Sequence, residues 1–573
     1  MAIAMKKTAA IAIAAGLTFA GSAGIAAQDA LAQTTNATAP TARATEQLAE
    51  SSTIPEGDNF SLTVNKRYNP TELRIGTGQE DEQISGGALN GVTFEIKKLK
   101  GDIRDQKEFN RLAKLTQDYN KAGADKSGFE LDFDNAVPPQ DKATAGQGQA
   151  KFENLPAGAY LVTETKHDGG LPADEGFEKN GTETLVPADP FIVFLPMTDP
   201  TGKEWISNVN VYPKNSFARA EKAVVDKDKH ALNQENITYT LTGVVPSAKE
   251  GEKLDWFGLR DAYNNTEITP NLDSITVKIV NADGETKVEK PNFAVAQDKG
   301  FGSKKDGDFA SDANDGFFIG VNSSLLKPGD KVVATVEAKL LEGSKKNQEV
   351  ENSVREYFRT SKDEAGFKPV PPETPPNDPP GDTPPNETPN DKVVSYFGNI
   401  QVFKTGEENG KRTALKGAKF EVGKCNSEGT AFDGKALAEG VTGDDGTFTF
   451  EGLHVTDYAD DEEIVDPGKY CLRETDAPAG YTFDKNKVYP LDLKRETKKG
   501  AQPADFTTKT DLQHGDYTDD GTVIMNGVAI NNLKRNVPFL PNTGGMGVLI
   551  MALAGLTIIG GGVYAARRNS QSA

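Results

Sequence analysis

The segment GKYCLRE, residues 468–474, begins with a glycine, continues through the apolar residues Tyr470, Cys471 and Leu472, and ends in a glutamate. The segment GAYLVTE, residues 158–164, has the same layout. Each is preceded by a short stretch in which apolar and polar residues alternate, at residues 446–450 and 149–152 respectively. This internal repeat predicts that the two regions share one fold, and the period of two predicts that the fold is built from strands.

Outward from these segments, the chain divides into three domains of short strands separated by loops rich in Gly, Asp and Pro. We expect the domains at residues 59–215, 216–362 and 393–536. The expected strands include 91–98, 149–155, 158–165 and 190–195 in the first domain and 236–244, 274–280, 317–321 and 331–340 in the second, and the one expected helix of the first domain is 106–120. The predicted fold class is all-β, with tandem immunoglobulin-like β-sandwich domains.

Two segments outside these domains do not have the pattern of a packed fold. Residues 33–58 are rich in Thr, Ala, Ser and Gln without any period, which is typical of a flexible leader. Residues 363–392 hold so many prolines that helix and sheet are both blocked, and we expect a semi-rigid extended spacer. The alternative for this segment is a ligand for a proline-reading partner.

The composition excludes several classes of function. The chain has 573 residues and a formal net charge of -21, which argues against nucleic acid as a partner. With two cysteines and four histidines, a four-cysteine zinc site is impossible, and we expect neither a metal nor a cofactor. No Ser/His/Asp set or phosphate loop is visible either, so we do not expect a turnover enzyme.

The N-terminus has the layout of an export signal. Lys6 and Lys7 precede an apolar run from residue 8 to residue 20, and Ala30-Leu31-Ala32 offers a cleavage site, so we interpret residues 1–32 as a secretory signal peptide. Export makes a disulfide between Cys425 and Cys471 plausible. Closing that loop of about 45 residues would contribute about 4 kcal/mol on the chain-entropy model.

The C-terminus, residues 540–573, has three parts in a fixed order. Leu540-Pro541-Asn542-Thr543-Gly544 precedes an apolar stretch, 546–566, which is long enough to cross a bilayer as a helix, and a basic tail follows. This order resembles the LPxTG sorting signal of Gram-positive surface proteins. The resemblance implies that a membrane sortase cuts between Thr543 and Gly544 and passes the threonyl group to an amine. The alternative is an ordinary anchor helix that a chance pentapeptide precedes.

The first domain ends in a motif that supplies such an amine. Its fixed positions are Trp205, Val209, Val211, Tyr212, Pro213 and Lys214. They match the pilin motif WxxxVxVYPK of sortase-polymerised pilus shaft subunits, in which the lysine accepts the threonyl group of the next subunit. We expect Lys214 to point outward at a strand end, because such an amine must be exposed on a rigid support. The alternative is one exposed interdomain lysine among many.

Each domain also places a lysine where its first strand should be apolar, and an asparagine in phase with the apolar face of its last strand. The pairs are Lys66 with Asn215, Lys222 with Asn352, and Lys404 with Asn532, for which Asn531 is the neighbouring alternative. A buried charged lysine costs several kcal/mol unless it is paired or neutral.

These pairs resemble the Cna-type domains of Gram-positive pilins and adhesins, in which a lysine and an asparagine form an isopeptide bond. Residues 470–481 match the pilin E-box YxLxETxAPxGY, and the resemblance makes Glu474 the acid that promotes the bond. In the first domain we assign Glu164, although the second half of the box is absent there. In the second domain the family uses an aspartate, for which Asp261 is in phase with the apolar residues and Asp273 is the alternative.

The expected chemistry follows from burial. Burial lowers the pKa of the lysine, so that its neutral amine becomes a nucleophile, and it raises the pKa of the acid, so that a protonated carboxyl polarises the asparagine carbonyl. The product is an amide, with ammonia lost. The alternative throughout is a snorkelling lysine that pairs with a carboxylate at a strand end.

Taken together, the motifs resemble the major shaft pilins of Corynebacterium and Actinomyces. The resemblance implies a cell-wall pilus in which Lys214 of one subunit is bonded to Thr543 of the next. The implied partners are a pilus-specific sortase, a housekeeping sortase, further copies of the chain, minor tip and base pilins, peptidoglycan and, in adhesion, a host surface. The alternatives are a single-copy wall-anchored adhesin, which would not need the pilin motif, and a minor pilin.

Overall fold

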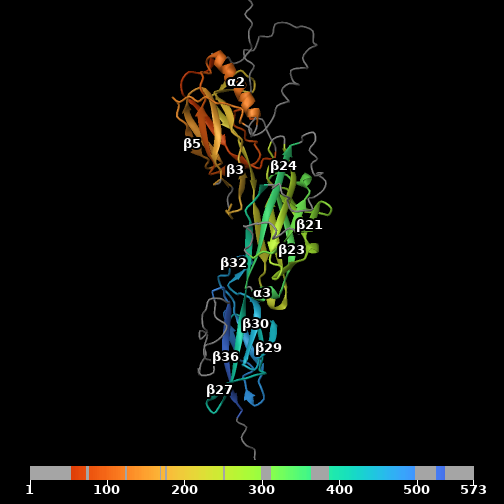
Figure 1. Cartoon of the computed structure of the whole chain (residues 1–573). Coiled ribbons are helices and arrows are strands. Elements are labelled where there is room, and N and C mark those ends of the chain that lie inside the picture. The colour runs from red at the N-terminus through yellow and green to blue at the C-terminus, as the bar shows by residue number, and fades with distance from the viewer. Residues whose placement is uncertain are drawn as a thin grey trace, which may run out of the picture. The chain divides into compact units, whose positions relative to one another are not determined.

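The computed structural model describes ten stretches of the chain: residues 53–71, 76–122, 126–167, 169–173, 177–249, 252–298, 312–346, 348–362, 386–496 and 524–535. The expected signal peptide, the sorting signal, most of the leader and most of the proline-rich spacer lie outside them. Within the described stretches, no helix combines the length and the apolar character that a membrane crossing needs. The described residues are mostly in strands, and α2 (Gln106–Lys121) is the long helix among them (Figure 1).

The chain forms two compact units. The first unit holds the described residues up to Phe397 together with residues 452–454 and 458–464, and it contains the first and second domains. The second unit holds the remainder of the third domain, starting at Gly398.

The described residues of the first domain form fourteen strands and one α-helix. They are β1 Phe60–Asn65, β2 Arg67–Tyr68, β3 Gly87–Asn90, β4 Thr93–Lys98, α2 Gln106–Lys121, β5 Gln140–Ala143, β6 Gln149–Leu155, β7 Gly158–Lys166, β8 Leu171–Pro172, β9 Thr184–Val186, β10 Phe191–Leu195, β11 Met197–Thr198, β12 Trp205–Ile206, β13 Asn208–Val211 and β14 Lys214–Ala218. The expected helix is therefore confirmed, and the side chain of Asp105 caps its N-terminus.

Three sheets of this domain position its site. They run β13-β1-β6, β10-β7-β4-β5 and β8-β3-β2-β14-β9. The first and last strands lie side by side, because β1 pairs in parallel with β13 and β2 pairs in parallel with β14. The core between the sheets is built from alternate residues of these strands, such as Leu62, Phe94 and Phe152, each at most 1% exposed.

The second domain packs two antiparallel sheets face to face. Its elements are β15 Ala220–Val225, η2 Ala231–Asn233, β16 Asn236–Val244, β17 Glu252–Tyr263, β18 Ile268–Pro270, η3 Leu272–Ser274, β19 Thr276–Asn281, β20 Gly284–Val288, β21 Phe293–Gln297, β22 Asp315–Val321, η4 Ser323–Leu325, β23 Lys331–Leu340, α3 Glu342–Lys346, β24 Glu349–Lys362 and β25 Asn386–Glu387. One sheet runs β15-β16-β23-β19-β20, and the other contains β21-β22-β17-β24. The first strand and the last strand are therefore in different sheets.

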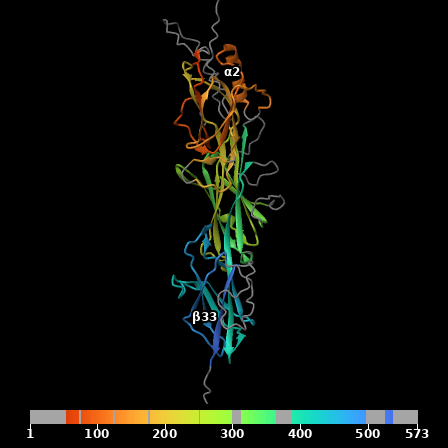
Figure 2. The ribbon, with the colours of Figure 1, turned by 90° about the vertical axis from the view of Figure 1, so that its left-hand side faces the viewer.

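The third domain returns to the arrangement of the first. Its strands are β26 Asp391–Glu408, β27 Lys411–Ala414, β28 Lys419–Lys424, β29 Ala438–Val441, β30 Thr447–His454, β31 Tyr458–Ala459, β32 Glu462–Glu463, β33 Tyr470–Asp476, β34 Tyr481–Thr482, β35 Val488–Leu491 and β36 Met525–Lys534. From Asn399 onward β26 pairs in parallel with β36, so the first and last strands are again neighbours. The opposite sheet runs β29-β28-β33-β35, and β33 is labelled in the blue part of Figure 2.

The expected strands are largely confirmed, with two differences. The strands β6, β16 and β23 have the expected bounds. Lys66 lies just beyond the end of β1 rather than inside a strand, and the expected closing strand of the first domain is divided into β12, β13 and β14. Pro213 separates β13 from β14, as expected for a residue that cannot donate to a strand ladder.

Candidate functional sites

The third domain brings its predicted lysine, acid and asparagine together in the core. Lys404 on β26, Glu474 on β33 and Asn532 on β36 are at most 4% exposed. The distance between Lys404 Nζ and Glu474 Oε2 is 3.7 Å, and Asn532 Nδ2 donates to Glu474 Oε1 at 2.7 Å. The acid therefore lies between the two groups that an amide bond would join.

The two neighbouring asparagines of β36 face opposite sides. Asn532 points at the buried acid, whereas Asn531 is half-buried, accepts a hydrogen bond from Thr405 Oγ1 at 3.0 Å and donates one to Glu407 at 3.2 Å. Because strand side chains alternate, only one of them can share the face of Lys404. The geometry favours Asn532.

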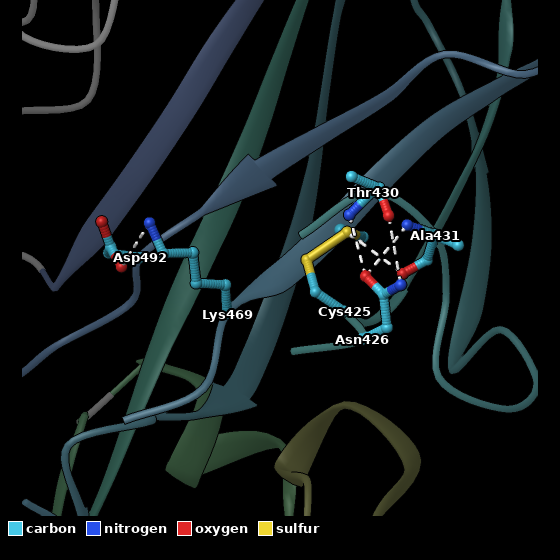
Figure 3. The surroundings of a disulfide bond; sticks show 7 residues. Cys425, Asn426, Thr430, Ala431, Lys469 and Asp492 are labelled. Carbon is cyan, nitrogen blue, oxygen red and sulfur yellow. Dashed lines mark hydrogen bonds and ion pairs between the residues drawn. A yellow bond between two sulfur atoms is a disulfide. The ribbon is translucent and has the colours of Figure 1, made fainter. Parts of the chain in front are cut away.

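The same domain contains a disulfide between Cys425 and Cys471, whose Cα atoms are 4.9 Å apart. It joins Cys425, the residue after β28, to β33, the strand that carries Glu474, and β28 and β33 are neighbours in one sheet. Figure 3 shows the bond beside Asn426, whose side-chain oxygen accepts hydrogen bonds from the backbone of Thr430 and Ala431. The loop after β28 is therefore tied both covalently and by hydrogen bonds.

The first domain assembles the corresponding group from Lys66, Glu164 on β7 and Asn215 on β14. Their side chains are at most 1% exposed. Lys66 Nζ donates to Glu164 Oε2 at 2.7 Å and also hydrogen-bonds Asn215 Oδ1, and Asn215 Nδ2 donates to Glu164 Oε1 at 2.8 Å. The carboxyl group bridges both nitrogens, although the E-box that surrounds Glu474 is only half present here.

The second domain uses a different arrangement. Lys222 on β15 hydrogen-bonds Asp261 on β17, and Asn352 Nδ2 on β24 donates to the other oxygen of Asp261 at 3.2 Å. The side chains of Lys222 and Asp261 are fully buried. The alternative acid, Asp273, is exposed within the short helix η3, so the geometry favours Asp261.

Burial sets the protonation chemistry of these groups. It lowers the pKa of Lys66 and of Lys404 to about 8, even though the neighbouring glutamates act in the opposite direction. Burial also lowers the pKa of Lys222 and raises the pKa of Asp261 and of Glu474. A neutral amine next to a carboxyl group that can carry a proton is the starting state that nucleophilic attack on an amide requires.

The geometry changes one detail of the expected chemistry. The carboxyl group was expected to polarise the asparagine carbonyl, but in the first and third domains it accepts a hydrogen bond from the asparagine NH2 group instead. A carboxyl group between the attacking and the leaving nitrogen is placed to move a proton from one to the other. In the first domain the asparagine oxygen instead accepts hydrogen bonds from Lys66 Nζ and from the backbone N–H of Ala188, a group that sequence reasoning missed.

The pilin motif runs from Trp205 to Lys214, and its Lys214 end lies beside residues of the second domain within one compact unit. Val209, Val211 and Tyr212 are buried, and Trp205 packs edge-on against Phe109 of α2. The motif therefore anchors the strand end to the core.

Lys214 is half-buried rather than fully outward. It lines a pocket with residues of both domains: Pro70, Val186, Pro187, Ala188, Asp189, Ser216, Ser247, Ala248 and Lys249. The next residue in the chain is Asn215, so the motif lysine and the buried site of the first domain are adjacent.

Within the described part of the chain, no group of three metal-ligating side chains is arranged to hold an ion.

The comparisons with known proteins agree with this layout. A family described as Gram-positive pilin subunit D1, N-terminal domain, matches residues 57–216, and a family described as SpaA, prealbumin-like fold domain, matches residues 398–502. The chain is 27% identical to fimbrial subunit type 1 of Actinomyces viscosus, over 93% of this chain and 94% of that protein. It is 26% identical to fimbrial subunit type 2 of Actinomyces naeslundii, over 87% of each chain.

Among solved structures, the full-length major pilin SpaD from Corynebacterium diphtheriae is similar. Its TM-score is 0.52 at 27% identity, over 83% of this chain and 97% of that chain. Tandem β-sandwich domains, the repeated buried lysine sites and fimbrial relatives along nearly the whole chain define a structural subunit of a bacterial pilus. These similarities support a sortase-type major pilin of Gram-positive bacteria.

Proposed function

We propose that this pilin is the shaft subunit of a covalent polymer. A pilus-specific sortase cleaves one subunit between Thr543 and Gly544 and transfers its threonyl carbonyl to Lys214 of the next. The bond that forms is an amide between Thr543 and the Nζ atom of Lys214, and the cysteine of the sortase leaves. A contact of this head-to-tail kind does not close on itself and therefore extends as a fibre.

The observation that supports this proposal is the position of Lys214. It lines a pocket at the junction of two domains and is attached to a rigid strand end, so a bulky acyl-enzyme can approach an amine that the fold holds in place. The sorting signal lies outside the described residues. The support for Thr543 as the residue that is transferred therefore comes from the sequence pattern at residues 540–573.

Each domain would in addition form one internal amide without a separate enzyme. The pairs are Lys66 with Asn215, Lys222 with Asn352, and Lys404 with Asn532. The neutral lysine amine attacks the asparagine carboxamide, the neighbouring acid carries a proton to the leaving nitrogen, and ammonia departs. The reaction occurs once per domain, so the chain is a substrate of sortases and not a turnover enzyme.

The finished fibre would be attached to peptidoglycan by a housekeeping sortase and would project from the cell wall. Minor tip and base pilins and a host surface are the remaining partners that this function requires. No cofactor takes part in either reaction, since both exchange one acyl bond for another.

The deciding experiment is a boiled denaturing gel of cell-wall extracts from strains that carry the wild-type chain, Lys214→Ala or Lys249→Ala. Lys249 is the matched control, because it lines the same pocket and pairs with Asp189 at 2.9 Å. We expect a high-mass ladder in the wild type and in Lys249→Ala, and monomer alone in Lys214→Ala. A ladder that persists in Lys214→Ala would assign the linkage to another lysine, and the absence of any ladder would favour the single-copy adhesin.

A further inference from the structure

The segment between β9 and β10 brings a backbone donor into the buried site of the first domain. Ala188 N donates to Asn215 Oδ1 at 2.9 Å, and its distance to Glu164 Oε2 is longer, 3.4 Å. Ala188 is only 9% exposed, and Asn215 is fully buried. The hydrogen bond is therefore shielded from water, which makes it stronger than the same bond at the surface.

The other contacts of Asn215 assign a role to each atom of its carboxamide. Nδ2 donates to Glu164 Oε1 at 2.8 Å, so the nitrogen that must leave faces the proton carrier. Oδ1 accepts from Ala188 N and from Lys66 Nζ, so the oxygen that gains charge faces a donor that is not consumed by the reaction. A preorganised donor about 2.7–3.1 Å from a developing oxyanion is the usual geometry of an oxyanion hole.

We propose that the backbone N–H of Ala188 is the oxyanion donor for amide formation between Lys66 and Asn215. This inference rests on the internal amide of the first domain that is proposed above. Neutral Lys66 Nζ attacks Asn215 Cγ, and the carbonyl electron pair moves onto Oδ1, where the Ala188 N–H stabilises it. Glu164 takes a proton from Nζ and delivers it to Nδ2. The C–Nδ2 bond then breaks, ammonia leaves, and Glu164 returns to its starting protonation state.

The second domain shows why this donor is a distinct feature. There Asn352 Oδ1 is buried and has no hydrogen-bond partner among the described residues, although Asn352 Nδ2 contacts its acid as Asn215 does. In both sites the acid accepts a hydrogen bond from the asparagine NH2 group, and the sites differ in the donor to the asparagine carbonyl. Removing the N–H of Ala188 should accordingly change the rate of amide formation in the first domain alone.

The test replaces the backbone N–H of Ala188 by an oxygen atom. Lactic acid is placed at position 188 of the full chain by suppressor-tRNA cell-free synthesis, which converts the Pro187–Ala188 amide into an ester and removes the N–H alone. Ala188→Gly is the matched control, since it removes the methyl group and retains the N–H. The readout is the fraction of the Lys66–Asn215 peptide that has lost ammonia, measured by mass spectrometry at intervals after a pulse of synthesis.

We expect the ester to slow linkage in the first domain about a hundredfold, whereas Ala188→Gly links at the wild-type rate. The Lys404–Asn532 peptide in the same molecules is the internal reference and should be unaffected. Wild-type linkage rates in the ester chain would overturn the proposal. An ester chain whose first domain no longer folds, as read by hydrogen exchange in a Lys66→Met background, would also overturn it, because the N–H would then serve folding. A wild-type chain that never loses ammonia in this domain would instead refute the underlying amide.

Discussion

The first and third domains build their buried sites in one way and the second domain builds its site in another. In the third domain the lysine and the asparagine come from neighbouring parallel strands, and in the first domain Lys66 lies between β1 and β2, the latter paired in parallel with the strand of Asn215. In both domains the glutamate reaches them from another sheet. In the second domain Asp261 and Asn352 are on neighbouring antiparallel strands, and Lys222 comes from the opposite sheet. The same three groups meet, but the side chain that crosses the core differs.

This difference accounts for the type of acid in each domain. Packed sheets lie about 10 Å apart, so the side chain that crosses between them must be long. Glu164 and Glu474 cross in the first and third domains, whereas Lys222 crosses in the second. Asp261 reaches its asparagine from the adjacent strand, where a short side chain suffices. The assembly therefore depends on burial and convergence and not on one strand order.

The largest effect should come from removing the acid, with Glu474→Gln in the third domain and Asp261→Asn in the second. Each variant should prevent amide formation in its own domain, so that no ammonia is lost there, and should leave the amides of the other domains intact. The internal amide of each domain closes the chain between its lysine and its asparagine into a long covalent loop. Losing that loop should lower the free energy of unfolding by about 5 kcal/mol. Intact mass with peptide mapping measures the linkage, and calorimetry measures the stability.

A matched control for that prediction is Glu421→Gln. Glu421 is in the same sheet as Glu474 but pairs with Arg473 at 2.6 Å near the surface. It should leave the linkage intact and change the stability by no more than about 1 kcal/mol. If the Glu474→Gln chain were still linked, a different group would have to carry the proton.

The second effect concerns side-chain length and tests the comparison directly. Glu474→Asp should slow linkage about a hundredfold, because withdrawing the carboxyl by about 1 Å or more misplaces it. Asp261→Glu should still link but should destabilise the core by about 1–3 kcal/mol, because the site is already filled. The linkage rates are measured by peptide mass spectrometry. Equal rates for Glu474→Asp and the wild type would contradict the argument from sheet separation.

The third effect is the pH dependence of linkage. Burial depresses the pKa of Lys66 and of Lys404 to about 8, so the reactive neutral amine increases as the pH rises toward that value. Below it the rate should rise about tenfold per pH unit, and above it the rate should level off. Time courses at several pH values after cell-free synthesis measure this, and the two domains should share one midpoint. A rate that does not change from pH 6 to pH 8 would show that the amine is already neutral at pH 6.

The smallest effect should come from Asn531→Ala. Asn531 contacts Thr405 and Glu407 on the side of β36 away from the acid, so its loss should cost about 1 kcal/mol and leave the linkage unchanged. Asn532→Ala in the same strand is the comparison variant and should abolish linkage in the third domain. If the two variants had the reverse effects, Asn531 would be the reacting residue.

Much of this architecture could be predicted from period-two patterns, and the limits are physical. The patterns placed Lys404 and Asn532 on inward faces, and phase alone favoured Asp261 over Asp273, because facing is a local property of a strand. Which sheet supplies the acid depends on long-range pairing, which local alternation does not encode. The donor at Ala188 is a backbone group, and since every residue but proline has one, no side-chain signal could have located it.

One adjacency in the chain determines how the proposed fibre carries tension. The neighbouring subunit would pull on the side chain of Lys214, and the next residue along the main chain toward the second domain is Asn215. The force would then pass to Lys222, cross the proposed amide to Asn352 and continue along the chain through the third domain toward Thr543. In such a fibre the main chain before Lys214 would lie outside the path of the force. The amide between Lys66 and Asn215 would hold the first domain to the part of the chain that carries the force. The surface of the first domain would therefore keep its shape when the fibre is stretched.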